Sequence, residues 1–197
     1  MTVSLRDATP ADASSLALFA DAATRRLMSW LWDARAGSGQ SSFEVGRSSI
    51  LSDVDQPIHH SRWRVAECDS VIAAGMNSYR LEPAASTGTG DLDDPLGPLT
   101  ELKAIASGTW YVSIASVFAE FRGRGIGRVL LAEADRLATA AGLDRVSLIV
   151  ASFNPRAKRL YEDCGFIEDA RRGFRPFPGS DPGGDWILMI KDLDPHR

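Results

Sequence analysis

The segment from Trp110 to Leu131 constrains the fold of this chain more than any other stretch. In its first half, the apolar residues Trp110, Val112 and Ile114 occupy every second position, which is the two-residue period of a β-strand. Its second half repeats apolar residues at helical spacing from Ile126 onward. The residues between are rich in glycine and arginine, so the segment predicts a strand, a tight turn and a helix in direct succession.

The predicted turn has the features of an anion site. Gly123, Gly125 and Gly127 are separated by single residues, which lets the backbone take positive φ and lets a ligand approach bare N–H groups. The first N–H groups of a helix lack internal partners, and the helix dipole adds positive potential there. Full positive charges surround the same turn, on Arg122, Arg124 and Arg128. A phosphate or pyrophosphate group suits this arrangement, and a purely structural turn with surface arginines is the alternative.

Two common nucleotide-binding fingerprints do not match the turn. A Walker loop requires a lysine followed by a hydroxyl residue, and neither follows Gly127. A dinucleotide fingerprint requires G-x-G-x-x-G and an acidic residue at the end of the next strand. Here the glycine spacing is G-x-G-x-G, and the next predicted strand, residues 146–150, ends in Ala151 and Ser152. The sequence therefore disfavours an ATP- or NAD-binding domain.

The turn and a second motif together resemble a known family. The turn reads R-x-x-G-x-G over residues 122–127, and the segment from Asn154 to Phe166 reads N-x-x-A-x-x-L-Y-x-x-x-G-F. In this order and at this spacing, both are similar to signatures of the GNAT superfamily of N-acetyltransferases. The first corresponds to the loop that binds the pyrophosphate of acyl-CoA. The matched block covers residues 110–170, about a third of the chain.

The resemblance implies a mixed α/β fold. We expect a central, mostly antiparallel sheet of about six or seven strands with a splayed parallel pair, flanked by about four helices. One domain would span residues 1–197, with a cofactor-binding core at about 110–170. The acceptor side would be formed by residues at about 10–60 and by two loops, 83–100 and 171–185.

The resemblance also assigns contacts with acetyl-CoA, the expected co-substrate. The pantetheine arm would pair with backbone groups just after the central strand, and the pyrophosphate would bind at the glycine–arginine turn. The residues implied are Val117, Phe118, Ala119, Arg122, Gly123, Arg124, Gly125, Ile126, Gly127, Arg128, Asn154, Lys158 and Tyr161. The residues themselves leave two alternatives open: Asn154 as a helix N-cap and Tyr161 as a packing residue.

Tyr161 and Asn154 are the catalytic residues that the resemblance implies. A phenol is protonated at neutral pH and can give its proton to the departing thiolate, so Tyr161 would be the general acid. Asn154 would orient the cofactor or a water molecule. The acceptor must lose a proton before it attacks, because an alkyl amine has a pKa of about 10.4. The base stays open: the central strand carries no carboxylate, and Glu82, Tyr79 or a water molecule are the candidates.

The function implied is an N-acetyltransferase that uses acetyl-CoA. The amine would attack the thioester directly, through a tetrahedral intermediate, and would belong to a small molecule, a peptide or a protein. The alternative from another class is a non-catalytic acyl-CoA-binding or interaction domain with the same fold. The residues do not reveal the acceptor, the length of the acyl group or the oligomeric state, although a homodimer is compatible with such folds.

Composition narrows the partners and the compartment. The 197 residues carry a net charge of −4 and are 44% hydrophobic, which is typical of a globular protein in water. The negative charge disfavours nucleic acid and anionic membranes as partners. The first residues lack the features of a signal peptide, and no apolar run approaches the roughly 20 residues of a membrane span. We therefore expect a cytoplasmic protein, without a metal because no Cys/His cluster has ligand spacing.

Local patterns predict the remaining elements. One helix should follow the Thr9-Pro10 start and end before Gly37. Residues 63–67 and 71–79 should form a hairpin, followed by an irregular stretch at 83–98. Gly142 should end the helix that begins at Ile126. The later strands are predicted at 145–151, 166–170 and 186–191, with a helix capped by Asn154 after the first of them.

Overall fold

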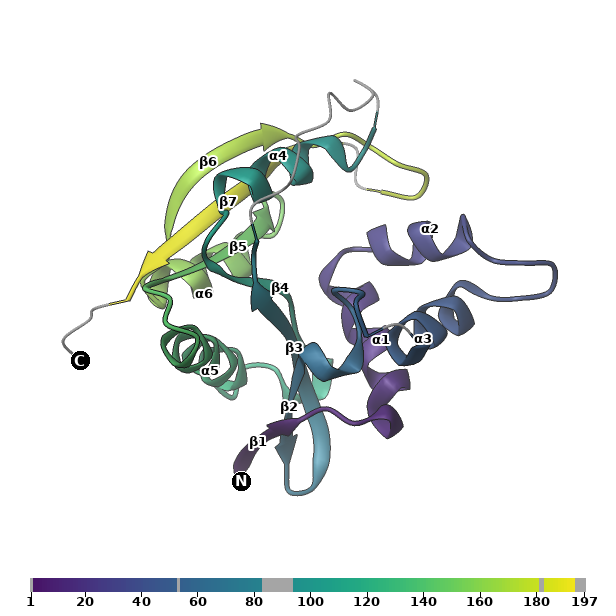
Figure 1. Cartoon of the computed structure of the whole chain (residues 1–197), viewed down its shortest axis with the longest axis horizontal. Helices are drawn as coiled ribbons and strands as arrows, with labels where there is room; N and C mark the ends of the chain where they lie inside the picture. Colours follow the sequence, from purple (N-terminus) through teal and green to yellow (C-terminus); the bar gives the residue numbers. More distant parts are fainter. Residues whose placement is uncertain (1, 53, 83–93, 181–182, 194–197) are drawn as a thin grey trace. The chain divides into compact units, whose positions relative to one another are not determined.

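The structure is a computed structural model and describes residues 2–52, 54–82, 94–180 and 183–193 (Figure 1). Its strands are β1 (Val3–Asp7), β2 (Trp63–Cys68), β3 (Val71–Arg80), β4 (Trp110–Val117), β5 (Arg145–Ala151), β6 (Ile167–Gly173) and β7 (Asp185–Asp192). Its α-helices are α1 (Ala13–Ala23), α2 (Leu27–Asp33), α3 (Ser42–Ser52), α4 (Gly97–Ile105), α5 (Ile126–Ala140) and α6 (Pro155–Asp163). The strands form a 7-stranded sheet in the order β1-β2-β3-β4-β5-β7-β6, with β4 and β5 parallel. The predicted mixed α/β class is confirmed, but the described residues form six α-helices where about four were expected.

The described residues fall into two compact units. Unit 1 comprises Met1–Ser78, Ile114–Leu130 and Pro178–Ser180. Unit 2 comprises Tyr79–Ser113, Leu131–Phe177 and Asp181–Arg197. Strands β3 and β4 and helix α5 each contribute residues to both units. The expectation of one domain over the whole chain stays a prediction.

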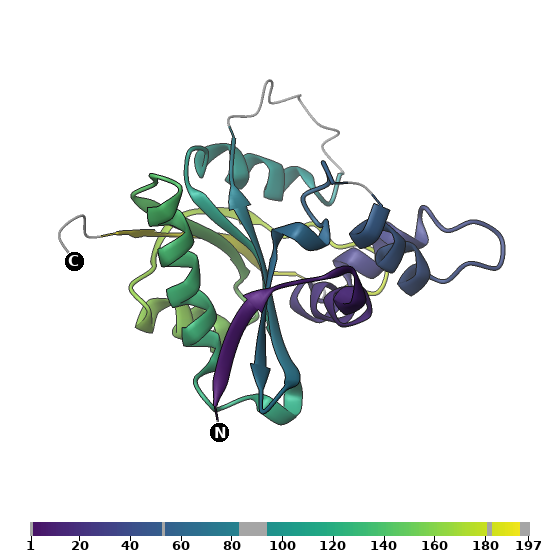
Figure 2. The ribbon, with the colours of Figure 1, turned by 60° about the horizontal axis from the view of Figure 1, so that its bottom comes forward.

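Unit 1 is built around the hairpin predicted from the sequence. β2 pairs antiparallel with β3 and with β1, and Figure 2 shows the amino-terminal strand beside the hairpin. The hairpin turn is formed by Asp69 and Ser70, whose φ values of 50° and 68° are typical of a tight two-residue turn. Trp63 and Val65 of β2 are almost fully buried, so one face of the hairpin carries the core of this unit.

Three helices complete the core of unit 1. Phe19 of α1, Trp32 of α2 and Ile50 of α3 are buried in one cluster with Trp63. The ring of Phe19 lies so close to β3 that a Cβ on Gly75 would come within 2.5 Å of it. Glycine at this position therefore lets α1 approach the sheet closely.

The single helix predicted for the amino-terminal segment is wrong, because the segment forms two helices, α1 and α2. Arg25 and Arg26 between them have φ values of 51° and 73°. Thr24 explains the break: its hydroxyl donates to the Ala20 carbonyl at 2.8 Å and accepts from the Met28 N–H at 3.2 Å. One hydroxyl thus serves the end of α1 and the start of α2, where backbone partners are lacking.

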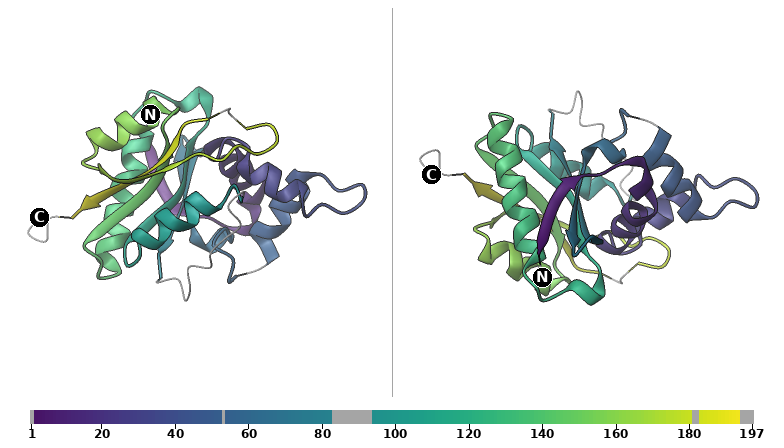
Figure 3. Two further views of the ribbon diagram at one scale, coloured as in Figure 1. Left: turned by 90° about the horizontal axis from the view of Figure 1, so that it is seen from above. Right: turned by 90° about the horizontal axis from the view of Figure 1, so that it is seen from below.

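Unit 2 contains the carboxyl-terminal strands. β5 and β6 both pair antiparallel with β7, and β4 pairs in parallel with the first half of β5. Helix α4 packs on β6 and β7 and helix α6 on β5, and the views of Figure 3 show α4 and α6 on opposite faces of these strands. Under α4 lies a core that includes Leu102 and Ala106 of the helix and Leu188 and Ile190 of β7.

Two loop predictions in unit 2 need correction. Of the loop predicted at 83–100, residues 83–93 lie outside the described residues, and Gly97 already begins α4. Pro98 suits the first turn of a helix, but together with the glycine it gives the sequence the composition of a loop. The loop predicted at 171–185 begins only at Phe174, because residues 171–173 continue β6 and pair with 185–187 of β7. The helix stop predicted at Gly142 is confirmed by its φ of 71°.

Candidate active site

The glycine–arginine turn lies in unit 1, between β4 and α5. Gly123 and Gly125 have φ values of 78° and 80°, so both occupy the left-handed region as predicted. Gly127 differs, because it is the second residue of α5. Ile126, the first residue of α5, is 1% exposed and anchors the start of the helix in the core. Two left-handed glycines and one buried isoleucine thus fix the course of the backbone.

Backbone N–H groups at the start of α5 are left for a ligand. The N–H groups of Arg128 and Val129 both donate to the Gly125 carbonyl, at 3.0 and 3.3 Å. The N–H groups of Gly125, Ile126 and Gly127 have no hydrogen-bond partner in the part of the chain that is described. Because α5 is 15 residues long, its dipole adds positive potential at this end. The start of α5 therefore suits an anion.

Two arginines brace the turn as well as charging it. Arg122 Nε donates to the Val117 carbonyl at 3.0 Å. Arg124 donates to the Glu120 carbonyl at 3.0 Å, and its guanidinium lies over the Phe121 ring. Both arginines are exposed. Their side chains therefore hold the turn in shape and keep positive charge beside the N–H groups.

Part of the backbone expected to bind the pantetheine arm is already paired within unit 1. The Val117 carbonyl accepts from Arg122, and the Phe118 N–H donates to the Ala73 carbonyl at 2.9 Å. The Ala119 N–H has no partner among the residues described. Of these groups, the Ala119 N–H is the one left for a ligand.

The second motif lies in unit 2, at the start of α6 and along it. Asn154 Oδ1 accepts from the Ala157 N–H at 3.3 Å, so Asn154 is the N-cap of α6. Lys158 Nζ lies 2.6 Å from Glu162 Oε1 and 3.7 Å from Glu168 Oε2. The hydrogen bond to Glu162 contributes most to the raised pKa of Lys158. The charge of Lys158 is thus shared with two carboxylates of its own unit.

Tyr161 has the properties of a proton donor. Its ring, on α6, is half-buried and meets Phe166 edge to face with the centroids 6.1 Å apart. Burial raises the pKa of Tyr161 to about 12, with a smaller effect from Cys164. The hydroxyl forms no hydrogen bond with any residue that the structure describes. A protonated phenol without an internal partner can donate to a ligand.

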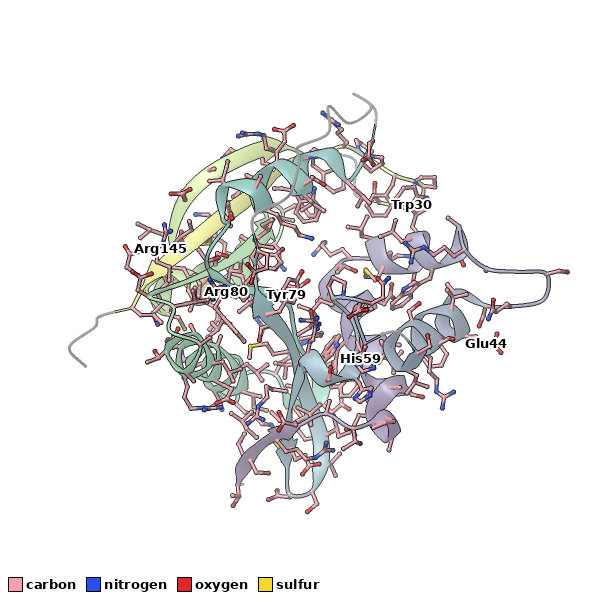
Figure 4. The ribbon with its side chains drawn as sticks, viewed as in Figure 1. Trp30, Glu44, His59, Tyr79, Arg80 and Arg145 are labelled. Carbon is pink, nitrogen blue, oxygen red and sulfur yellow. The ribbon has the colours of Figure 1, made fainter. Side chains whose placement is uncertain are left out.

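Two further tyrosines, Tyr79 and Tyr111, form a ring pair in unit 2, and Tyr111 lies near Tyr161. The rings of Tyr79, near the end of β3, and Tyr111, in β4, meet edge to face with centroids 5.8 Å apart; Figure 4 labels Tyr79. Burial raises the pKa of Tyr111, and the phenols of Tyr79 and Tyr161 raise it further. An electrostatic effect of this kind requires nearby groups, so unit 2 brings the three tyrosines together. We call them the tyrosine cluster.

Lys103 of α4 joins the tyrosine cluster and is missing from the residues predicted above. Its Nζ lies 5.6 Å from the centroid of the Tyr111 ring. Burial lowers the pKa of Lys103, although part of the side chain stays accessible. The helical spacing of Leu99, Leu102 and Ala106 could have placed Lys103 on a helix, but its contact with Tyr111 has no signal in the sequence.

The candidate bases from the sequence have other partners. Glu82 forms an ion pair with Arg80, with Nε and Oε1 3.1 Å apart and both side chains exposed; Figure 4 labels Arg80. Tyr79 belongs to the tyrosine cluster.

In the described ranges, no group of three or more His, Cys, Asp or Glu residues could hold a metal ion. None of the helices there is long and apolar enough to cross a membrane.

The fold and the turn together define a class of protein. A mixed sheet with β4 and β5 parallel, and a glycine–arginine turn that leads into α5, suit a phosphate-bearing ligand at the start of a helix. The model of the acetyltransferase (GNAT) family matches residues 25–166. The chain belongs to this family, which confirms the resemblance of the two sequence motifs.

Two curated relatives match parts of the chain. A mycothiol acetyltransferase from Beutenbergia cavernae is 40% identical over 65 residues, which cover 33% of this chain and 22% of that protein. A spermidine N(1)-acetyltransferase from Vibrio cholerae is 43% identical over 51 residues, which cover 25% of this chain and 30% of that protein. The match thus spans less than a third of the length of either relative.

Solved structures share the fold over nearly the whole chain. A crystal structure of an acetyltransferase has a TM-score of 0.65 at 19% identity, covering 97% of this chain and 100% of that one. The PaiA N-acetyltransferase from Thermoplasma acidophilum, solved in complex with coenzyme A, has a TM-score of 0.53 at 17% identity, covering 98% and 100%. At these identities the likeness shows the fold.

Proposed function

We propose that the chain transfers an acetyl group from acetyl-CoA to a primary amine. The observation that carries this proposal is the set of N–H groups at the start of α5 that bond to no described residue, beside Arg124 and Arg128. These groups suit the pyrophosphate of a CoA thioester. Membership of the acetyltransferase (GNAT) family supports acetyl transfer as the reaction.

The proposed cofactor contacts are those predicted from the sequence, but Lys158 has less support than the others. The pyrophosphate would accept from the N–H groups of residues 125–127 and pair with Arg122, Arg124 and Arg128. The pantetheine arm would lie along residues 117–119, where the Ala119 N–H is available. Lys158 is a weaker candidate, because two glutamates already hold its ammonium group.

The proposed chemistry uses Tyr161 as general acid. When the amine attacks the thioester carbon, the carbon–sulfur bond breaks and the sulfur leaves as a thiolate, which a nearby phenol can protonate. The raised pKa keeps Tyr161 protonated at neutral pH. Asn154 would orient a ligand or a water molecule through Nδ2, because its Oδ1 already accepts from Ala157.

Release of the CoA thiol in the presence of a panel of primary amines tests this function. The panel should contain spermidine, amino acids and a lysine-containing peptide, because the acceptor class is open. Acetylation of at least one amine, confirmed by mass spectrometry, is the expected result. Binding of acetyl-CoA without acetylation of any amine would favour a non-catalytic acyl-CoA-binding domain, and absence of acetyl-CoA binding would contradict both functions.

A further inference from the structure

Lys103 differs from the other lysines of this chain. The sequence contains three, Lys103, Lys158 and Lys191. Lys158 is held by two glutamates, and Lys191 Nζ lies 2.6 Å from Asp135 Oδ2. Lys103 has neither an ion pair nor a hydrogen bond with the residues that the structure describes. As an ammonium group in a partly buried position it would therefore lack a counter-charge among the described residues, which is costly.

None of the charged side chains that the structure describes forms an ion pair with Lys103. Three ion pairs join charged side chains of α4, β6 and β7: Glu101 with Arg172, and Arg171 with Glu168 and Asp185. Lys191 of β7 pairs with Asp135, and Asp169 and Asp192 are exposed. At the start of α4, Arg175 donates to the Asp94 carbonyl. The titratable group that contacts Lys103 is the phenol of Tyr111, which lies in turn beside Tyr79 and near Tyr161. Burial is the cause that lowers the pKa of Lys103, so this amine is neutral over a wider range of pH than an ordinary lysine.

Tyr111 connects Lys103 to the proposed acid. Lys103 Nζ lies over the Tyr111 ring at 5.6 Å, and the Tyr161 phenol is near enough to raise the pKa of Tyr111. The acid and the base of an acyl transfer act on the leaving sulfur and the attacking nitrogen. Both atoms are bonded to the same carbon during the reaction, so the two catalytic groups must be neighbours. In unit 2, Lys103 contacts Tyr111 and Tyr161 lies near the same tyrosine, which makes Lys103 the candidate for the second group.

We propose that Lys103 accepts the proton that the acceptor amine must lose, an inference that rests on the function proposed above. The lone pair of Lys103 Nζ takes one proton from the acceptor ammonium, which becomes a neutral amine. The amine nitrogen then bonds to the thioester carbon, and the carbon–sulfur bond breaks with its electron pair going to sulfur. Tyr161 gives its proton to the sulfur and regains one from the nitrogen, which became positively charged on attack. Lys103 finally releases its proton to water.

The variant Lys103→Arg distinguishes two roles for Lys103, accepting a proton and binding the acceptor through its charge. If Lys103 attracted an anionic part of the acceptor, Lys103→Arg would keep the function, because a guanidinium is always charged. A guanidinium cannot accept a proton at neutral pH, so Lys103→Arg should fail as a base. Lys103→Met keeps most of the apolar stem and removes the amine.

Competitive labelling with acetic anhydride tests the protonation state of Lys103 without any enzymatic turnover. The wild-type protein is labelled at a series of pH values, and mass spectrometry follows the peptides that carry Lys103 and Lys158. The reactivity of Lys103 should rise with a midpoint at lower pH than that of Lys158, whose pKa is raised by its glutamates. An equal or higher midpoint for Lys103 would overturn the proposal.

Kinetics with two kinds of acceptor test the role itself. With an alkyl amine from the panel, Lys103→Met and Lys103→Arg should both lower kcat/KM by about 10²–10⁴-fold, the usual contribution of acid–base catalysis. With hydroxylamine, which is neutral at pH 7 and needs no base, both losses should be far smaller. The affinity for acetyl-CoA should stay unchanged in both variants. Arg145→Met, which removes an exposed cation at the start of β5, is the matched control and should behave as wild type; Figure 4 labels Arg145.

The outcomes distinguish this inference from the proposed function. Turnover by wild type together with full activity of Lys103→Met would overturn the role of Lys103 and leave the acetyltransferase function standing. Rescue by Lys103→Arg, or equal losses with the alkyl amine and hydroxylamine, would show a binding or structural role instead. If wild type binds no acetyl-CoA or acetylates no amine, the proposed function fails, and the role of Lys103 fails with it.

Discussion

Tyr161 combines two properties that a proton donor needs, a raised pKa and a hydroxyl that no described residue binds. Tyr161→Phe removes the proton and keeps the ring that packs on Phe166. We expect kcat to fall by about 10²–10⁴-fold, with the affinity for acetyl-CoA nearly unchanged. Steady-state kinetics and calorimetry on the same preparation measure the two quantities. Normal turnover in the variant would show that Tyr161 is a packing residue.

Asp12 gives a prediction about stability and pH. Its carboxylate, 6% exposed, accepts from the Arg6 guanidinium at 2.8 and 3.0 Å and from the Thr9 N–H at 2.7 Å. The hydrogen bond with Arg6 is the largest cause that lowers the pKa of Asp12 from 3.8 to about 2. Because the folded-state pKa is the lower one, this stabilisation, about 2 kcal/mol, is fully present above pH 4 and is lost as the pH falls towards 2.

Urea unfolding at several pH values checks the effect of Asp12. The free energy of unfolding of wild type should fall between about pH 4 and pH 2 more steeply than that of Asp12→Asn, which has no carboxyl group to titrate there. At neutral pH the variant should be less stable, since it loses the ion pair with Arg6. Parallel pH profiles for the two proteins would contradict this assignment.

At the scale of elements, the contact between α1 and β3 depends on Gly75. A Cβ at this position would lie 2.5 Å from the Phe19 ring, which is fully buried and cannot move away freely. Gly75→Ala should therefore lower the free energy of unfolding by about 1–3 kcal/mol, the usual cost of overpacking a core. Gly173→Ala in β6 is the matched control, because a Cβ there meets nothing within 4 Å. Equal urea midpoints for the two variants would refute the role of Gly75.

Periodicity predicted the elements whose sequence carries one clear pattern. The central strand, the helix from Ile126 and the cap at Asn154 are found where the patterns place them. The break after α1 was missed because apolar residues keep their helical spacing across it, while the hydroxyl of Thr24 ends one helix and starts the next. Helix α4 was missed because Gly97 and Pro98 gave its first turn the composition of a loop.

At the scale of the whole chain, the two family signatures fall in different units. Unit 1 carries the glycine–arginine turn, and unit 2 carries Asn154, Lys158 and Tyr161. Each signature is local in sequence, so both could be read directly from the residues. Lys103 could not, because its relation to Tyr111 is a contact between a helix and a strand. The amine acceptor is likewise hidden from the sequence, since the residues that select it need not follow any local motif.

Calorimetric titration with acetyl-CoA, beside CoA, ATP and NAD, tests the central claim most directly. Wild type should bind acetyl-CoA in preference to ATP and NAD, and Gly125→Val should lose that binding. A β-branched residue is strained at a φ of 80°, so the variant would displace the N–H groups that hold the pyrophosphate. Undiminished acetyl-CoA binding by Gly125→Val would contradict the assignment of the turn. Absence of acetyl-CoA binding by wild type would contradict the proposed acetyltransferase function as a whole.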